Sequence, residues 1–148
     1  MKTAIVYYSK HHGNTKKLID AIVKANPDVV AIDAIAEKDI DVSSYECVGF
    51  ASGIYGANFA PALIKLAPDL VKKGQKVFFL YTSSLNKESF TNSIRKAIEP
   101  TGAEIIGGYG CRGYDTFGPF KLVGGIGKEH PTAEEIQGAV DYFKSIAE

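Results

Sequence analysis

Short apolar runs rich in β-branched and aromatic residues alternate along this chain with longer segments whose apolar residues recur every three or four positions. The runs predict five strands, at residues 3–8, 29–34, 47–52, 76–83 and 104–110. Because each run is apolar throughout, we expect both faces of each strand to be buried. Strands of this kind that alternate with helices form a parallel sheet covered by helices on both sides, which predicts an α/β fold.

Four helices are expected between and after these strands. Pro68 lies inside the second helical pattern, so that helix should kink or restart there. The last helix should begin with Thr132 and Glu135, which have the spacing of a capping box and follow Pro131. The apolar positions that define the helices include Leu18, Ile22, Leu63, Ala67, Phe90, Ile94, Ile136, Val140 and Phe143.

Length and charge narrow the range of functions. With 148 residues the chain fits one domain, residues 1–148, and we find no repeat or linker in it. The 17 basic and 17 acidic residues cancel, so no surplus of positive charge is available to meet a nucleic-acid backbone. We therefore expect no nucleic-acid partner.

Cysteine spacing and the first residues predict a cytoplasmic protein. Cys47 and Cys111 are far apart and match no metal or redox motif, which is typical of free thiols in a reducing compartment. The apolar run at residues 3–8 is too short for a signal peptide or a membrane span.

The loop after the first strand, Ser9-Lys10-His11-His12-Gly13-Asn14-Thr15, contains the groups of an anion site. Gly13 allows close backbone approach, and the N–H groups at the start of a helix favour negative charge. A polar turn in which Asn14 caps the helix explains the same residues equally well. The loop matches neither the dinucleotide fingerprint nor the phosphate loop of nucleotide hydrolases, so dinucleotides and ATP are not expected ligands.

This loop resembles the phosphate loop of flavodoxins, in which a strand leads through [ST]-x-[ST]-G-x-T into a helix. Gly13, Asn14 and Thr15 match the end of that pattern. Ser9 lies one residue further from Gly13 than the pattern has it, and His12 stands where the second hydroxyl residue is usual. The form His-His-Gly-Asn-Thr is similar to that of one branch of flavodoxin-like FMN-binding proteins.

The resemblance covers nearly the whole chain. Residues 51–59 and 81–87 occupy the places of the two flavin-contacting loops, and residues 110–122 resemble a segment of the same branch. The family implies a flavodoxin-like three-layer sandwich, with a five-stranded parallel sheet in the order 2-1-3-4-5 and bound FMN. The cofactor-binding residues that we predict are Ser9, Lys10, His11, His12, Gly13, Asn14, Thr15, Ser52, Gly53, Ile54, Tyr55, Gly56, Thr82, Ser83, Ser84 and Cys111.

Several of these residues have a second interpretation. Tyr55, expected in a loop, either stacks on the flavin ring or packs on its own loop. Thr82, Ser83 and Ser84 either bond the pyrimidine edge of the flavin or cap the following helix. Cys111 is otherwise a small apolar residue at a strand end. Adjacent histidines such as His11 and His12 rarely share one metal ion, so we expect no metal site.

The leading functional prediction is an FMN-binding redox protein that transfers electrons between protein partners, a reductase and an acceptor. The alternative is an FMN-dependent reductase of quinones or other small acceptors, with the glycine-rich residues 110–131 covering part of its site. A third reading is a flavodoxin-like domain that has lost its flavin. The sequence contains no acid–base pair or activated nucleophile, so we predict no catalytic residue, and the cofactor would supply the chemistry.

Overall fold

The computed structural model describes residues 1–10, 13–113 and 130–147. Its strands are β1 (Thr3–Tyr8), β2 (Val30–Asp33), β3 (Cys47–Tyr55), β4 (Asn58–Phe59), β5 (Lys76–Ser83) and β6 (Glu104–Arg112). Its α-helices are α1 (Asn14–Ala25), α2 (Pro61–Leu70), α3 (Asn92–Ile98) and α4 (Ala133–Ala147). Two short 3₁₀ turns, η1 (Glu88–Thr91) and η2 (Glu99–Thr101), flank α3.

Five strands form one parallel sheet in the order β2-β1-β3-β5-β6. In the numbering of the predicted strands this is the order 2-1-3-4-5, so the predicted fold class is confirmed. A two-residue strand that the sequence analysis did not predict, β4, pairs antiparallel with the end of β3 and forms a short hairpin. The hairpin makes β3 longer than the predicted strand and carries Tyr55 within it.

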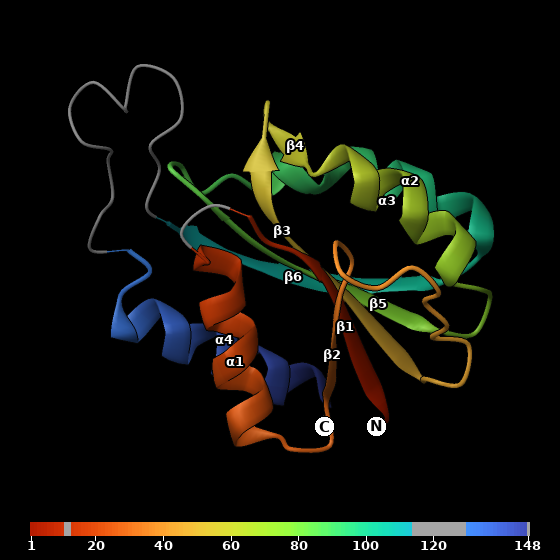
Figure 1. Ribbon diagram of the computed structural model, residues 1–148, viewed down its shortest axis with the longest axis horizontal. Helices are drawn as coiled ribbons and strands as arrows, with labels where there is room; N and C mark the ends of the chain where they lie inside the picture. The colour runs from red at the N-terminus through yellow and green to blue at the C-terminus, as the bar shows by residue number, and fades with distance from the viewer. Residues whose placement is uncertain (11–12, 114–129, 148) are drawn as a thin grey trace.

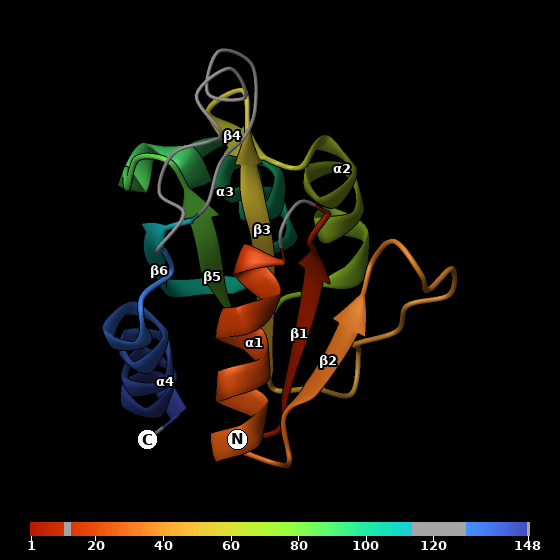
Figure 2. The ribbon, with the colours of Figure 1, turned by 60° about the vertical axis from the view of Figure 1, so that its left-hand side comes forward.

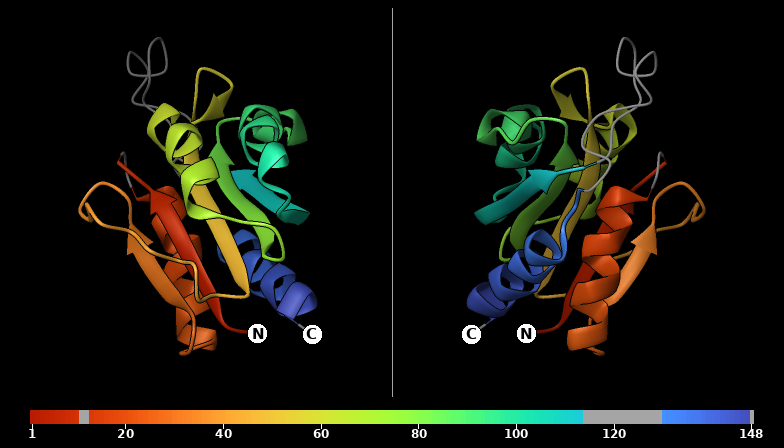
Figure 3. Two further views of the ribbon diagram at one scale, coloured as in Figure 1. Left: turned by 90° about the vertical axis from the view of Figure 1, so that its right-hand side faces the viewer. Right: turned by 90° about the vertical axis from the view of Figure 1, so that its left-hand side faces the viewer.

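Helices cover both faces of the sheet, so the molecule has three layers (Figures 1 and 3). Helices α2 and α3 lie on one face, over a core that includes Phe50, Phe59, Phe79 and Ile94. Helices α1 and α4 lie on the other face, over a core that includes Ile5, Leu18, Phe78 and Phe143. Continuous apolar strands are needed because successive side chains of one strand supply both cores.

Local patterns explain where several elements end. The capping box is confirmed, since the Glu135 backbone N–H donates to Thr132 Oγ1 at 3.1 Å and the Thr132 N–H donates to Glu135 Oε1 at 2.8 Å. The expected restart at Pro68 is wrong: α2 continues through Pro68 and ends two residues later. Pro68 lacks one backbone N–H donor, and the two residues after it remain helical. The two edge strands, β2 and β6, are less buried than predicted, because each has a single neighbour in the sheet. Val30 in β2, for example, is 42% exposed.

Candidate functional site

Those residues predicted to bind a cofactor that the structure describes lie at or next to the carboxyl ends of the parallel strands. Figure 2 shows β1, β3 and β5 ending at the same side of the sheet, where α1 begins. In the sheet register, Tyr8 lies beside Ser52, Gly53 beside Thr82, and Thr82 beside Cys111. Segments more than 70 positions apart in sequence, Tyr8 and Thr82 for example, therefore meet at one edge. This is the edge where open α/β sheets bind their ligands.

Helix α1 begins without a side-chain cap. Gly13 is the residue before its first turn and has a left-handed backbone, with φ of 62°. Asn14 is the first residue inside the helix, so the interpretation of Asn14 as its cap is wrong. The first turn contains no acidic residue, and no cap hydrogen bond from a side chain is present in the described part of the chain. A helix start of this kind favours an anion, because the positive end of the helix dipole lies there and no acidic side chain of the first turn opposes it.

Thr15 joins this helix to the end of β5. Its Oγ1 lies 2.9 Å from Thr82 Oγ1 in a buried position, and Thr15 is 1% exposed. A hydroxyl group can donate one hydrogen bond and accept others. If Thr82 donates in this pair, the proton of Thr15 remains for a ligand. Thr82 in this arrangement positions Thr15.

Asn14 packs against the chain that leaves β6. A Cβ atom at Gly113 would lie only 2.7 Å from Asn14 Nδ2, so a larger residue at position 113 would displace the Asn14 side chain. The Gly113 N–H in turn donates to the Ser83 carbonyl at 2.9 Å. The start of α1, the end of β5 and the end of β6 are therefore packed together at one place.

Tyr55 lies at the end of β3, and the expectation of a loop at this position is wrong. Its ring meets the ring of Tyr8 edge to face, with centroids 6.0 Å apart. Burial raises the pKa of Tyr55, and the nearby Tyr8 adds to the shift. The turn that follows has positive φ at Gly56 (56°) and Ala57 (65°), which brings the chain back as β4. Lys10 Nζ lies 6.0 Å from the centroid of the Tyr8 ring.

The side chains of Ser52 and Ile54 serve the fold. Ser52 is fully buried, its hydroxyl donates to the Gly53 carbonyl, and it accepts from the Ala60 N–H at 3.0 Å. It thereby ties β3 to the start of α2. Ile54 packs against the core between the sheet and α2 and α3. A ligand at the Ser52–Gly56 segment would not reach the buried Ser52 hydroxyl, whereas the Ile54 side chain is partly exposed.

The loop after β5 does not cap the next helix, so that interpretation of Thr82, Ser83 and Ser84 is wrong. The next helical turn starts at Glu88, with Lys87 before it. Ser83 Oγ accepts from the Leu85 N–H at 3.2 Å, and the Ser84 carbonyl accepts from Arg112 Nε at 3.2 Å. These residues order the loop itself.

Cys111 is a packing residue near the end of β6. It is 3% exposed, and burial, with a smaller effect from Glu135, raises the pKa of its thiol to about 12. A thiol of this kind stays protonated near neutral pH and is a poor nucleophile. The structure therefore agrees with the apolar interpretation of Cys111.

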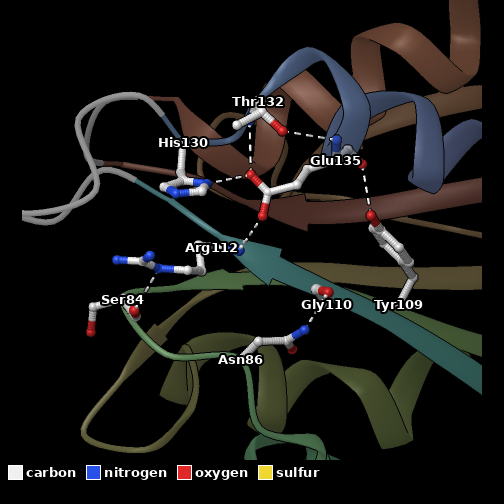
Figure 4. A network of polar contacts seen from close by, with 8 residues as sticks. All are labelled: Ser84, Asn86, Tyr109, Gly110, Arg112, His130, Thr132 and Glu135. Atoms are coloured by element: carbon white, nitrogen blue, oxygen red, sulfur yellow. Dashed lines mark hydrogen bonds and ion pairs between the residues drawn. The ribbon is translucent and has the colours of Figure 1, made fainter.

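Sequence reasoning missed two residues that organise this region, Asn86 and Arg112. Asn86, Arg112 and Glu135 connect the loop after β5, the end of β6 and the start of α4 (Figure 4). Asn86 and its partner Gly110 are 24 positions apart, and Arg112 and Ser84 are 28 apart. No local pattern signals such pairs.

Two parts of the predicted site lie outside the described residues. They are His11 and His12, and residues 114–129 of the glycine-rich segment 110–131. In the described part of the chain, no three His, Cys, Asp or Glu side chains are grouped to hold a metal ion. Among the described helices, none has the length and apolar character needed to cross a membrane.

Comparison with known proteins identifies the family. A family profile described as flavodoxin domain matches residues 5–102, well over half of the chain. This chain belongs to the flavodoxin domain family. The predicted family is thus confirmed. An uncharacterised protein of Methanocaldococcus jannaschii is 36% identical over 149 aligned residues, which cover 99% of this chain and 98% of that relative.

Solved flavodoxins share the fold of this flavodoxin-domain protein. Oxidised flavodoxin 1 from Bacillus cereus superposes with a TM-score of 0.74 at 11% identity, over 99% of this chain and 97% of that one. Fusobacterium nucleatum flavodoxin, solved bound to flavin mononucleotide, gives 0.65 at 14% identity, over 99% and 98% of the two chains. At such low sequence identity, the similarity shows that these proteins share a backbone fold.

Proposed function

We propose that this protein binds FMN and carries electrons between protein partners. The observation that carries the proposal is the start of α1, where Gly13 has a left-handed backbone, Thr15 is buried and the first turn contains no acidic residue. It lies at the strand edge that family members use, beside the segments 53–56 and 82–84. One of the structural relatives was solved with flavin mononucleotide.

The residues have separate roles in this proposal. Gly13, Asn14 and Thr15 hold the phosphate with backbone N–H groups and one hydroxyl, and Ser9, Lys10 and the two histidines add polar groups around it. Tyr55 and the backbone of residues 53–56 and 82–84, at the ends of β3 and β5, would hold the ring. Bound FMN supplies the redox chemistry, and the chain binds and orients it. An electron carrier of this kind needs no catalytic acid or base.

A reducing compartment fits the chain, and we propose a cytoplasmic location. Cys47 and Cys111 are both free and buried. They lie at opposite ends of strands, at the start of β3 and near the end of β6. The reductase and the acceptor that exchange electrons with the flavin are partners still to be identified.

Titration by flavin fluorescence quenching tests the proposal. We expect FMN to bind at least about tenfold more tightly than riboflavin, because the phosphate is worth more than one charge-assisted hydrogen bond. We also expect FMN to bind more tightly than FAD, because the loop lacks the dinucleotide fingerprint. Riboflavin, which lacks the phosphate, serves as the matched control. Equal affinity for FMN and riboflavin would contradict a phosphate site at α1.

Mixing the FMN-loaded protein with NADH or NADPH separates the carrier from a reductase of quinones or other small acceptors. A carrier keeps its visible flavin absorbance until a separate reductase is added. Rapid bleaching by the nicotinamide alone would instead show a reductase. Adding a quinone to the bleached protein would then test the acceptor.

A further inference from the structure

The loop after β5 is attached to the molecule by side chains that lie outside the predicted flavin contacts. We propose that Asn86 and Arg112 are positioning residues, which hold residues 83–86 in the conformation that receives the flavin. This inference rests on the proposed function and extends it to two residues that the sequence analysis did not place in the flavin site.

Two hydrogen bonds fasten the loop to β6 (Figure 4). Asn86 Nδ2 donates to the Gly110 carbonyl at 2.9 Å, and Arg112 Nε donates to the Ser84 carbonyl at 3.2 Å. A third bond, from the Gly113 N–H to the Ser83 carbonyl at 2.9 Å, continues the ladder between the two strands. The loop is therefore bonded to β6 or to the residue after it through Ser83, Ser84 and Asn86.

The same bonds cover the open side of the sheet. Strand β6 is at the edge, and the N–H and C=O groups of successive residues in a strand point alternately to its two sides. Since Gly113 bonds toward β5, the backbone groups of Gly110 and Arg112 point to the open side. Asn86 covers the Gly110 carbonyl, and Glu135 Oε2 accepts from the Arg112 N–H at 3.3 Å. Side chains thus satisfy edge groups that would otherwise face water or another strand.

Helix α4 holds β6 in place at this point. Glu135 also bonds His130 Nδ1 and the Thr132 N–H, and its backbone carbonyl accepts from the Tyr109 hydroxyl at 2.8 Å. Figure 4 shows these contacts converging on the start of α4. The loop, the end of β6 and the start of α4 therefore form one connected unit.

This connection matters for a flavin because donors fixed in advance lose little conformational freedom on binding. Reduction places negative charge on the pyrimidine side of the ring, so the reduced form depends more on the N–H groups of the loop. Releasing the loop should weaken binding of reduced FMN more than of oxidised FMN. The midpoint potential should then fall.

The test uses Asn86→Ala and Arg112→Gln in the full chain. Arg112→Gln leaves the backbone bond to Glu135 intact and removes the bond to Ser84. Lys87→Gln is the matched control for loss of charge, in the same loop, and Asn92→Ala is the control for loss of an exposed asparagine. Circular dichroism first establishes that each variant is folded.

Hydrogen exchange of backbone amides in the FMN-free chain measures how firmly the loop after β5 is held to β6. We expect exchange of residues 83–87 to rise at least about fivefold in each variant and to stay unchanged in both controls. In the FMN-loaded chain the two-electron potential should fall, by about 30 mV if reduced FMN loses tenfold more affinity than oxidised FMN.

If hydrogen exchange of residues 83–87 is unchanged in both variants, Asn86 and Arg112 do not hold the loop, whatever the FMN affinity of the variants. Faster exchange with unaltered FMN affinity and potential would overturn the positioning role. Failure of the unaltered chain to bind FMN would overturn the proposed function, and this role with it, while the exchange data would still decide the attachment.

Discussion

The paired hydroxyls of Thr15 and Thr82 connect the expected phosphate site to the expected ring site. Their oxygens are 2.9 Å apart and buried, so each threonine constrains the rotamer of the other. Removing either hydroxyl leaves the other buried without that partner, at a cost of about 1–3 kcal/mol of stability. Any binding experiment on these residues must separate this cost from lost ligand contact.

Thr15→Val should weaken FMN binding about tenfold to a hundredfold. A hydrogen bond to a charged group contributes about 1.5–3 kcal/mol, which corresponds to that range in Kd. Thr15→Ser, which retains the hydroxyl, should bind within about threefold of the unaltered chain. Fluorescence quenching by FMN, well below the melting temperature of each variant, measures the difference. Equal Kd values for the Val and Ser variants would show that Thr15 is not a ligand.

Gly110→Ala should destabilise the fold by about 1–3 kcal/mol or more. An added Cβ would lie 2.0 Å from a ring carbon of Tyr81, which is 5% exposed and has little room to move. At Gly53 the nearest atom to an added Cβ is 3.7 Å away, so Gly53→Ala should change stability by less than about 0.5 kcal/mol. Urea unfolding of the FMN-free variants compares the two. Similar stability would mean that β6 and Tyr81 adjust easily.

Among the elements, α4 has a start whose stability depends on pH. Burial alone would raise the pKa of Glu135, but hydrogen bonds from His130 and from the N–H groups of Thr132 and Arg112 outweigh it and lower the pKa below its ordinary value of 4.5. The unfolded chain therefore takes up this proton at a higher pH than the folded chain. The contribution of Glu135 to stability is complete above the unfolded pKa and is lost as the pH falls through the folded one.

Glu135→Gln should lower the free energy of unfolding by about 1 kcal/mol at pH 6, the usual difference between a charged and a neutral acceptor. The gap to the unaltered chain should shrink below about pH 4.5. Glu134→Gln, an exposed neighbour in the same turn, is the control and should show no such gap. Urea titrations between about pH 3 and pH 6 measure the difference in free energy of unfolding between each variant and the unaltered chain. A gap that is constant with pH would contradict the role of the Glu135 charge.

For the whole molecule, charge distribution predicts the redox potential. The net charge is zero, and residues 52–58 and 82–86 contain no acidic side chain. Lys10 and Arg112 are exposed near the same edge. Acidic flavodoxins, which this chain resembles in fold, surround the flavin with carboxylates that oppose the reduced anion. Each such charge that is absent favours the reduced anion by about 1 kcal/mol.

We expect the potential of the second one-electron reduction to lie on the order of 100 mV above that of strongly acidic flavodoxins, since about 1.4 kcal/mol corresponds to roughly 59 mV.

Leu85, which is 57% exposed in the loop after β5, allows a direct test of this charge effect. Leu85→Asp should lower the potential by tens of millivolts at low salt, and Leu85→Asn, which is polar but uncharged, should not. Spectroelectrochemical titration measures both. Equal potentials for the two variants would show that backbone contacts outweigh surface charge.

Much of the fold followed from local pattern. Continuous apolar runs located the five parallel strands. Consecutive residues of the three inner strands, β1, β3 and β5, are apolar because both faces of these strands are buried. The spacing of Thr132 and Glu135 located the start of α4, because a capping box involves residues within one turn. Resemblance to flavodoxins supplied the strand order, which periodicity does not determine.

The tertiary structure decided what depends on distant partners. Thr15 and Thr82 are 67 positions apart and become neighbours because α1 begins at the edge of the sheet where β5 ends. Asn86 and Arg112 acquire their contacts because β6 is the strand beside β5. Tyr55 belongs to a strand because β4 returns to pair with it. Residue types and local spacing thus determine which elements form, and the order of strands in the sheet determines which side chains meet.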